Sequence, residues 1–400
     1  MENNARKRGW GLFVLGLVIG LLVSLIIISV IYKDQASFAS GSLVDERVLK
    51  KMENLETLIH KRFYLHDVTD AELEEGIYKG MLDALDDPYS EYYTAEELNA
   101  LMDQSQGIYY GIGAYVGLDT ETGIPKISSV IEGTPAEEAD LRANDLIYMI
   151  DGETTAGLTL SEAVSRIKGP QGTSVTLTVI REGVRDYLDF TITRRKVESP
   201  TVVFKMLEDD IAYIQITEFD EVTVDQFADA LAMAKGSFME GMILDLRGNP
   251  GGNLNAVVEI ARMILPEGLI VYTEDKEGKR TEYTCDGTRE LQTPLVVLTD
   301  GNSASASEIL AGAIQDYGIG KLVGTTTFGK GIVQQVIALD DGSAIKVTIS
   351  SYFTPNGRNI HGTGIAPDVE CKFDSEKYYE NEDHYDNQLE CAKEELKKHL

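Results

Sequence analysis

The sequence predicts an α/β protein of several domains, an α+β multidomain arrangement with an apolar helix ahead of its globular part. Three observations predict this class. The chain has 400 residues, more than a single compact domain usually holds. An apolar run without charges occupies residues 10–32. Short alternating strands begin near residue 107, and strands alternate with helices after residue 199, as they do in an α/β core.

The apolar run at residues 10–32 is predicted to be a transmembrane helix. At about 1.5 Å per residue it is long enough to cross a hydrocarbon core of roughly 30 Å. A cleaved signal peptide is the competing interpretation, but its apolar region is usually about 7 to 15 residues long. Basic residues fill positions 6–8, before the run. The protein is therefore expected to span the cell membrane once. Residues 1–9 would be a cytoplasmic tail, and the residues after the span would lie outside the cytoplasm.

Residues 44–104, after a tether at 33–43, are predicted to form a helical region. Its first helix carries apolar residues at spacings of four and three, which place them on one face: Val48, Met52, Leu55, Ile59 and Phe63. This stripe either pairs two subunits in a homodimer or packs on its own domain. A second helical stretch, at residues 70–85, ends at a turn where Pro88 follows two aspartates.

Residues 105–196 are predicted to form a small domain of short strands. Strands are expected at residues 126–130, 146–150, 174–181 and 187–194, and helices at 133–139 and 160–167. A glycine loop runs directly into a strand at the start of this region. Beside a helix, such a loop forms a groove in which backbone N–H groups hold a carboxylate while a peptide adds as a strand. The groove residues would be Gly111, Ile112, Gly113, Ala114 and Val116.

Residues 197–373 alternate strands with helices, which indicates an α/β core. The expected strands are 211–216, 241–246, 294–298 and 321–323, and the expected helices are 224–234, 254–264 and 305–317. The last segment, residues 374–400, is charged and predicted to be helical in its final half. No chemistry is indicated there.

Asp245-Leu246-Arg247-Gly248-Asn249-Pro250-Gly251-Gly252 leaves a predicted strand and enters a helix through a glycine-rich turn. Free N–H groups would face whatever lies over this turn. A phosphate loop and a simple tight turn explain the segment equally well.

Ser303-Ala304-Ser305-Ala306-Ser307-Glu308 opens a predicted helix. Ser305 followed three residues later by Glu308 has the pattern of a capping box, so structure alone would explain these residues. A catalytic serine is the alternative.

Lys330 follows a glycine-rich segment, 324–329, that imitates a Walker A loop until Gly331 replaces the required hydroxyl residue. If Lys330 lies on the strand predicted to follow, Gln334 shares its face and its amide oxygen can reach the lysine amine. A lysine acts as a base only when it is neutral. Desolvation would have to lower its pKa from about 10.4 toward 7 or 8.

The formal net charge of −30, from 66 acidic and 36 basic residues, disfavours nucleic acids and anionic lipid surfaces as partners. The three cysteines, Cys285, Cys371 and Cys391, are far apart, and their spacing indicates neither a disulfide framework nor a zinc site. The five histidines form no HExxH cluster. No metal or cofactor is expected.

Together these motifs resemble the carboxyl-terminal processing proteases, membrane-linked or exported serine peptidases of family S41 with an internal PDZ domain. The resemblance covers roughly residues 44–373. Its most specific segments are Leu85–Ser90, Asp245–Arg247 with Gly251-Gly252, Ser303–Glu308, Thr327–Gly331 with Gln334, Tyr352–Gly357 and Gly364–Asp368.

The resemblance implies that Ser305, the middle serine of its run, is the nucleophile, that Lys330 is its general base and that Gln334 positions the lysine. The backbone N–H groups of Ala306 and Gly252 would form the oxyanion hole, with Gly251 as the fallback for the second donor. Spacing alone does not select Ser305 among its neighbours.

The resemblance further implies a PDZ domain at residues 105–196, a ClpP/crotonase-like peptidase core at 197–373, and no cofactor. The expected activity is cleavage of extracytoplasmic proteins near an apolar C-terminus that the PDZ groove holds, with a regulatory partner protein as a further expectation. Asp140 and Asn144 replace two glycines of the family's PDZ pattern, and both residue types tolerate left-handed turns. A catalytically silent PDZ scaffold is the competing class, and a nucleotide-binding protein is a weaker one.

Overall fold

The computed structural model describes residues 43–380 and 385–400. The chain divides into two compact units, residues 1–81 and 82–400. The predicted transmembrane run at residues 10–32 and the tail before it lie outside the described residues. Within those described ranges, no helix combines the length and the apolar character that crossing a membrane requires.

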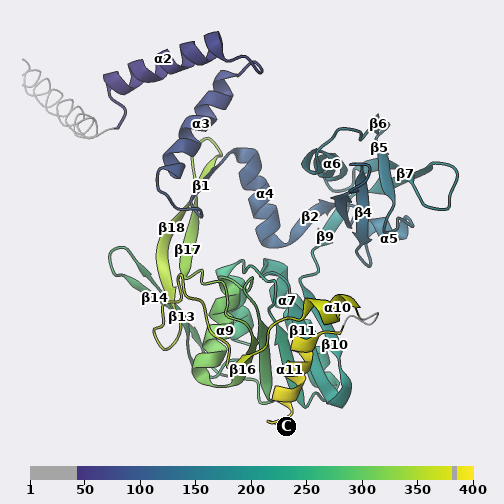
Figure 1. Cartoon of the computed structure of the whole chain (residues 1–400), viewed down its shortest axis with the longest axis vertical. Coiled ribbons are helices and arrows are strands. Elements are labelled where there is room, and N and C mark those ends of the chain that lie inside the picture. Colours follow the sequence, from purple (N-terminus) through teal and green to yellow (C-terminus); the bar gives the residue numbers. More distant parts are fainter. Residues whose placement is uncertain (1–42, 381–384) are drawn as a thin grey trace, which may run out of the picture. The chain divides into compact units, whose positions relative to one another are not determined.

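The first unit contains helix α2 (Glu46–Arg62) and most of α3 (Asp70–Asp83) (Figure 1). Asp45 begins α2, because its carboxylate accepts a hydrogen bond from the Val48 N–H at 2.8 Å. The predicted apolar stripe lies along this helix, with Phe63 directly after its end. Leu55 is 49% and Phe63 46% exposed, whereas Val48, Met52 and Ile59 are half-buried. No residue of the helix is fully buried, so part of its apolar face is open to solvent.

The small strand-rich region forms an antiparallel sheet in the order β3-β4-β5-β7-β8, with β6 beside β5. Its strands are β3 (Ala114–Leu118), β4 (Pro125–Val130), β5 (Leu146–Ile150), β6 (Glu153–Thr154), β7 (Ser174–Ile180) and β8 (Leu188–Thr193), and its helices are α5 (Pro135–Glu138) and α6 (Leu160–Ile167). Inward residues alternate along β7, and Ile127, Ile147 and Leu177 are fully buried. β2 (Ile108–Gly111) pairs with β9 (Arg195–Glu198) at the base of this region.

The two positions where glycine was expected do adopt left-handed backbone. Asp140 has φ 63° and Asn144 has φ 72°. Asp and Asn visit this conformation at lower cost than other side chains do. The turns of the family pattern are thus retained without their glycines.

The larger core contains a six-stranded sheet in the order β10-β11-β12-β15-β16-β19, parallel except for β10. Its strands are β10 (Val202–Met206), β11 (Ile211–Ile216), β12 (Gly241–Asp245), β15 (Leu295–Thr299), β16 (Gly320–Gly324) and β19 (Val369–Glu370), with a short 3-10 helix, η1 (Glu208–Asp210), before β11. Every residue of β12 and β15 is buried, as expected of central parallel strands covered on both faces.

Helices cover both faces of this sheet (Figure 1). One face packs against α7 (Glu221–Gly236), α8 (Leu254–Ala261) and α9 (Ala306–Tyr317), and the other against α11 (Asn387–Leu396). Ala392 and Leu396 of α11 are fully buried beside Ile243 and Val296. Helix α11 is therefore an integral layer of the core, whereas α10 (Ser375–Glu380) has no buried residue.

A second, five-stranded sheet has the order β1-β18-β13-β14, with β17 also paired to β18. Its strands are β1 (Glu91–Tyr93), β13 (Gly268–Asp275), β14 (Arg280–Cys285), β17 (Ile332–Ala338) and β18 (Ala344–Phe353), and α4 (Ala95–Gln106) follows β1. The strand predicted to follow Lys330 is β17, which begins at Ile332. Lys330 therefore lies before this strand, and the condition under which Gln334 would share its face is not met. A register irregularity between Val333 and Gln334 also breaks the simple alternation of faces.

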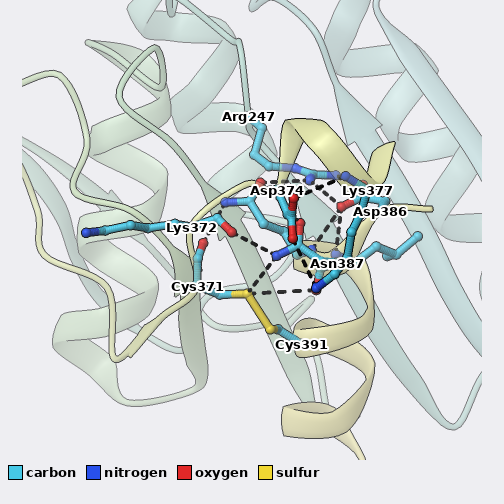
Figure 2. Close-up of a disulfide and its surroundings, with 10 residues drawn as sticks. Arg247, Cys371, Lys372, Asp374, Lys377, Asp386, Asn387 and Cys391 are labelled. Atoms are coloured by element: carbon cyan, nitrogen blue, oxygen red, sulfur yellow. Dashed lines mark hydrogen bonds and ion pairs between the residues drawn. A yellow bond between two sulfur atoms is a disulfide. The ribbon is translucent and has the colours of Figure 1, made fainter. Parts of the chain in front are cut away.

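Cys371 and Cys391 form a disulfide, shown in Figure 2. Their spacing of 20 residues gave no indication of this pairing. It joins the residue after β19 to the middle of α11, whereas Cys285 is buried as a free thiol. The expectation that no disulfide forms is therefore wrong for two of the three cysteines.

Candidate active site

The two glycine- and serine-rich motifs lie side by side because they follow neighbouring parallel strands. Asp245–Gly252 leaves β12, Ser303–Glu308 follows β15, and these strands are paired. The Ser303 hydroxyl donates to the Leu246 carbonyl at 2.8 Å. The Ala304 N–H donates to the Asn249 carbonyl at 3.0 Å. The carboxyl ends of two parallel strands thus meet at one edge of the sheet, where ligand sites of open α/β sheets form.

Ser305 stands at the start of α9 in a strained backbone conformation, φ 56° and ψ −113°. Such a conformation costs a non-glycine residue on the order of 1–3 kcal/mol and concentrates at functional sites. The position at a helix start places its hydroxyl beside N–H groups that have no partner within the helix. Ser305 is therefore held where an attacking oxygen and free donors coincide.

Gly251 allows the glycine-rich turn to lie directly against Ser305. Its φ is 105°, and a Cβ at this position would come within 2.7 Å of both the Ser305 Cβ and the Ala304 carbonyl oxygen. Real Cβ atoms do not approach backbone so closely. Only glycine lets the turn carry Gly252 to the side of the serine.

Glu308 is fully buried and connects the serine and lysine segments. Its Oε2 accepts hydrogen bonds from the N–H groups of Ser305 and Lys330, both at 2.9 Å. Its Oε1 accepts from the Thr327 hydroxyl at 2.5 Å and from the Gly329 N–H at 2.7 Å. The predicted capping contact from Glu308 to the Ser305 N–H is confirmed, but three further donors make this carboxylate a junction between two loops.

The Lys330 ammonium lies over the ring of Tyr89, with Nζ 4.3 Å from the ring centroid. Burial lowers its pKa, and the positive charge of Lys346 lowers it further, whereas Asp87 and Glu91 act in the opposite sense. The net direction is downward, toward the neutral amine that a general base requires.

Ser305, Lys330 and Gln334 line one pocket of about 390 Å³, together with Gly252 and Ala306. All five residues predicted for the catalytic site and oxyanion hole therefore face the same space. In residues 43–380 and 385–400, however, no hydrogen bond joins the Lys330 amine to Ser305 or to Gln334. The Gln334 amide instead donates to the Thr348 hydroxyl at 3.1 Å, which leaves the amide oxygen of Gln334 available to a donor.

A second pocket, of about 450 Å³, is lined by Gly111, Ile112, Gly113, Ala114 and Val116, all five predicted groove residues. Val164 and Ile167 of α6 line it as well. It therefore combines a glycine loop, a strand edge and an apolar helix face, the three parts needed for peptide addition to a sheet.

One group of side chains in residues 43–380 and 385–400 places possible metal-ligand atoms within 4.8 Å of one another: Glu56, His60 and Asp70. The group is exposed, and a 3.1 Å contact already pairs His60 with Asp70. Exposed acidic groups of this kind are common without an ion, so the cluster supports no metal assignment.

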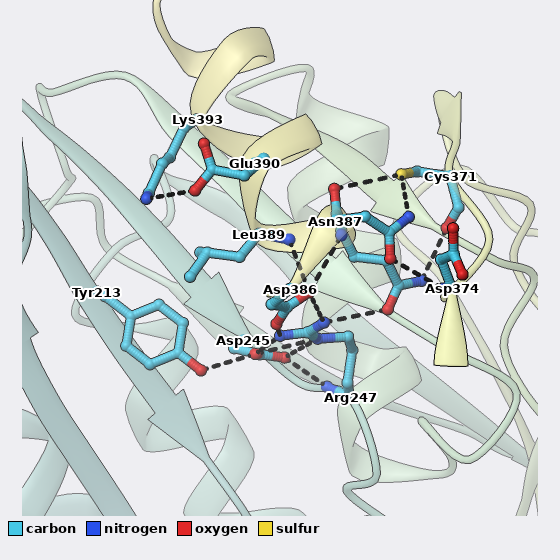
Figure 3. A network of polar contacts seen from close by, with 11 residues as sticks. Tyr213, Asp245, Arg247, Cys371, Asp374, Asp386, Asn387, Leu389, Glu390 and Lys393 are labelled. Carbon is cyan, nitrogen blue, oxygen red and sulfur yellow. Dashed lines mark hydrogen bonds and ion pairs between the residues drawn. The ribbon is translucent and has the colours of Figure 1, made fainter. Parts of the chain in front are cut away.

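Sequence reasoning missed a network around Arg247, drawn in Figure 3. Arg247 binds Asp245 two residues before it and Asp386 in the C-terminal segment, at 2.6 and 2.8 Å. The Tyr213 hydroxyl also donates to Asp245 at 2.8 Å. A basic residue two positions after a strand-ending aspartate was visible in the sequence, but nothing there linked it to residue 386.

Comparison with known proteins agrees with this architecture. Residues 210–371 match peptidase family S41, residues 126–181 match a PDZ domain, and residues 29–97 match the family described as the activating protease CtpB N-terminal domain. The fold and motifs thus define a serine-type peptidase that carries a peptide-binding PDZ domain.

The chain is 37% identical over 336 residues to the carboxyl-terminal-processing protease of Synechocystis, covering 82% of this chain and 78% of that protein. It is 38% identical over 331 residues to the carboxy-terminal processing protease CtpB of Bacillus subtilis, with 82% and 68% covered. A solved structure, the photosystem II D1 C-terminal processing protease, shares 31% identity, with 80% and 86% covered and a TM-score of 0.48. The chain belongs to the carboxyl-terminal processing protease family, whose members are serine-type peptidases.

Proposed function

We propose that this protein is an endopeptidase that cleaves extracytoplasmic proteins near their C-terminus with Ser305 as nucleophile and Lys330 as general base. The observation that carries the proposal is that Ser305 at its strained helix start and the partly desolvated Lys330 line one pocket. A scaffold protein needs neither the strained serine nor the half-buried lysine.

In the first step, the Ser305 oxygen attacks the scissile carbonyl carbon while neutral Lys330 accepts the hydroxyl proton. The carbonyl oxygen becomes an oxyanion, and the N–H groups of Ala306 and Gly252 donate to it. Loss of one such donor typically costs about 3 to 4 kcal/mol of transition-state stabilisation. The tetrahedral intermediate then collapses, and protonated Lys330 gives its proton to the leaving amine.

In the second step, water attacks the acyl-enzyme ester and returns Ser305 to its free form, with Lys330 again accepting and donating the proton. Gln334 is assigned to orientation of the lysine through its amide oxygen. Its other amide atom is already bound to Thr348, which limits rotation of the amide.

The groove from Gly111 to Val116 is assigned to the substrate's C-terminus, with apolar terminal residues preferred because the pocket is lined by Ile112, Val116 and Ile167. This pocket would hold one end of the substrate while another part is cut.

The proposed location is a single-pass protein of the cell membrane with its catalytic part outside the cytoplasm. The basic residues before the apolar run at 10–32 support this orientation. The Cys371–Cys391 disulfide supports it as well, because disulfides persist mainly in oxidising compartments. The partly exposed apolar stripe on α2 supports a homodimer. A regulatory partner protein is also proposed, but no surface is assigned to it.

The test is cleavage of an unfolded protein with an apolar C-terminus by the full chain in detergent, compared with Ser305→Ala and Lys330→Ala. We expect both substitutions to abolish cleavage while peptide binding persists. Full activity of Ser305→Ala would overturn the assignment of the nucleophile.

A further inference from the structure

The Arg247 guanidinium is held between two carboxylates from distant parts of the chain. Nε donates to Asp245 at 3.0 Å, and Nη2 donates to Asp245 at 2.6 Å and to Asp386 at 2.8 Å. Nη1 donates to Asp386 and to the Gln388 side-chain oxygen, both at 3.0 Å. Each guanidinium nitrogen therefore has a partner, and the planar fork fixes the direction of the side chain.

The C-terminal partners have further contacts of their own, and Figures 2 and 3 label Asp386 and Cys371 among them. Asp386 caps α11, because its Oδ1 accepts from the N–H groups of Gln388 and Leu389 at 3.0 Å. The Gln388 amide donates to the Cys371 carbonyl at 2.7 Å, and Cys371 is bonded to Cys391 one helical turn further along α11. Asp386 and Gln388 thus present fixed acceptors to Arg247.

Burial raises the pKa of Asp386, but hydrogen bonds and charge from Arg247 lower it more, so its net shift is downward. The carboxylate therefore stays charged at neutral pH. An ionised pair in partly buried surroundings holds its geometry more firmly than a neutral one.

At its other end, the segment after Arg247 is hydrogen-bonded to two residues near the proposed nucleophile, Ala304 and Ser307. Asn249 is fully buried, its side-chain oxygen accepts from the Gly251 N–H at 2.8 Å, and its carbonyl accepts from Ala304 and from the Ser307 hydroxyl. The turn that carries Gly252 is consequently held at one end by the Arg247 network and at the other by hydrogen bonds to the serine segment. A change in the direction of Arg247 would move one of these two attachments.

We propose that Asp386 and Gln388 are positioning residues for the peptidase reaction, which hold Arg247 and through it the turn whose Gly252 N–H stabilises the oxyanion. This inference rests on the proposed function of Gly252. Buried ion pairs contribute little net stability compared with apolar replacements, and their best-attested effect is to specify one geometry. The proposed role of the Arg247 network is therefore to hold the turn that carries Gly252 in one geometry.

The test uses the full chain and the variant Asp386→Asn, which keeps the shape and the helix-capping oxygen but removes the charge. We expect kcat to fall at least about tenfold, less than the roughly 10²- to 10³-fold that loss of a direct oxyanion donor causes. KM should stay within error of the original protein, and kcat should fall by more than the folded fraction at the assay temperature. The thermal midpoint is expected to drop, because Arg247 loses one of its two carboxylate partners. Asp386→Glu should restore part of kcat. The matched control is Glu390→Gln on the same helix, whose carboxylate pairs with Lys393 at 2.7 Å and should leave kcat unchanged.

Unchanged kcat in Asp386→Asn, or a loss that follows KM and the folded fraction, would overturn the inference. If Asp386→Asn does not fold, Gln388→Met decides, since it keeps the ion pair and removes the acceptor for Arg247 together with the donor to the Cys371 carbonyl. A lower kcat at constant KM supports the inference, and an unchanged kcat overturns it. Failure of the proposed function is distinguishable, because cleavage by the unsubstituted chain would then be absent or independent of Ser305.

Discussion

The buried carboxylate of Glu308 accepts a hydrogen bond from the backbone N–H of Lys330 at 2.9 Å. The same oxygen accepts from Ser305, one turn earlier on the edge of α9. The proposed nucleophile and base come from segments 25 positions apart in sequence, from 305 to 330, and they share this acceptor. Their relative placement is thus set by backbone contacts rather than by a direct bond between their side chains.

Glu308→Gln should lower both stability and activity. The carboxylate meets four donors, and an amide would direct its own N–H groups at two of them. An unsatisfied buried polar group costs about 1–3 kcal/mol. Urea denaturation should show a loss of this size, and cleavage should fall more than the folded fraction does. Glu259→Gln, on an exposed ion pair with Arg262, is the control, and an unaltered denaturation midpoint in Glu308→Gln would refute the role.

The pH dependence of cleavage should respond to charges around Lys330. A lysine base is active when neutral, so the rate rises with pH through its pKa, which burial and then Lys346 lower. Lys346→Met removes a repelling charge and frees Glu91 from its ion pair, and both effects raise that pKa. The rising limb of the pH–rate profile should therefore move to higher pH.

Asp87→Asn should move the same limb the other way. The Asp87 carboxylate raises the pKa of Lys330, so its neutralisation lowers the pH at which the base becomes active. The two variants are controls for each other, and profiles measured at saturating substrate compare them directly. Shifts in one common direction would contradict the assignment of Lys330 as the titrating base.

Gly251→Ala should abolish cleavage, because its Cβ would collide with the Ser305 Cβ and the Ala304 carbonyl at 2.7 Å. Gly248→Ala is the matched control. It also has a positive φ, 70°, but open space around the new Cβ, so it should bear only a backbone cost of about 1–2 kcal/mol. Comparable cleavage by the two variants would show that close approach of the turn to Ser305 is unimportant.

Loss of the Cys371–Cys391 disulfide should destabilise the peptidase core. The bridge spans 20 positions, and closing a loop of this size stabilises a fold by about 3 kcal/mol in the chain-entropy account. Urea denaturation of the double variant Cys371→Ser/Cys391→Ser should show this loss. Reductant should lower the midpoint of the original protein to that of the variant and leave the variant unchanged. Equal midpoints before reduction would contradict the prediction.

Elements with strong periodicity were predicted well from the sequence. The strands at residues 146–150 and 211–216 and the helix at 160–167 have the predicted bounds, because alternating or fully apolar runs ended by turn residues leave little choice of structure. The residues of the candidate site were found by resemblance, since Ser305 and Lys330 are individually ambiguous.

The remaining features depend on pairings between distant residues. Arg247 and Asp386 lie 139 positions apart, and no local pattern encodes their contact. The Cys371–Cys391 pairing depends on the packing of α11 against β15 and β16, which the local sequence does not encode. The backbone N–H groups of Gly329 and Lys330 donate to Glu308, a contact between distant segments that the local sequence pattern does not encode.

The backbone of Ser305, at φ 56°, belongs to a region that glycine enters freely and serine enters at a cost. A glycine at position 305 would therefore relax the start of α9, and Ser305→Gly is expected to melt at a higher temperature than the original protein while cleaving nothing. At this one residue the requirements of folding and of the proposed chemistry oppose each other. The chain keeps the Ser305 hydroxyl although a glycine would adopt this backbone conformation at a lower free energy.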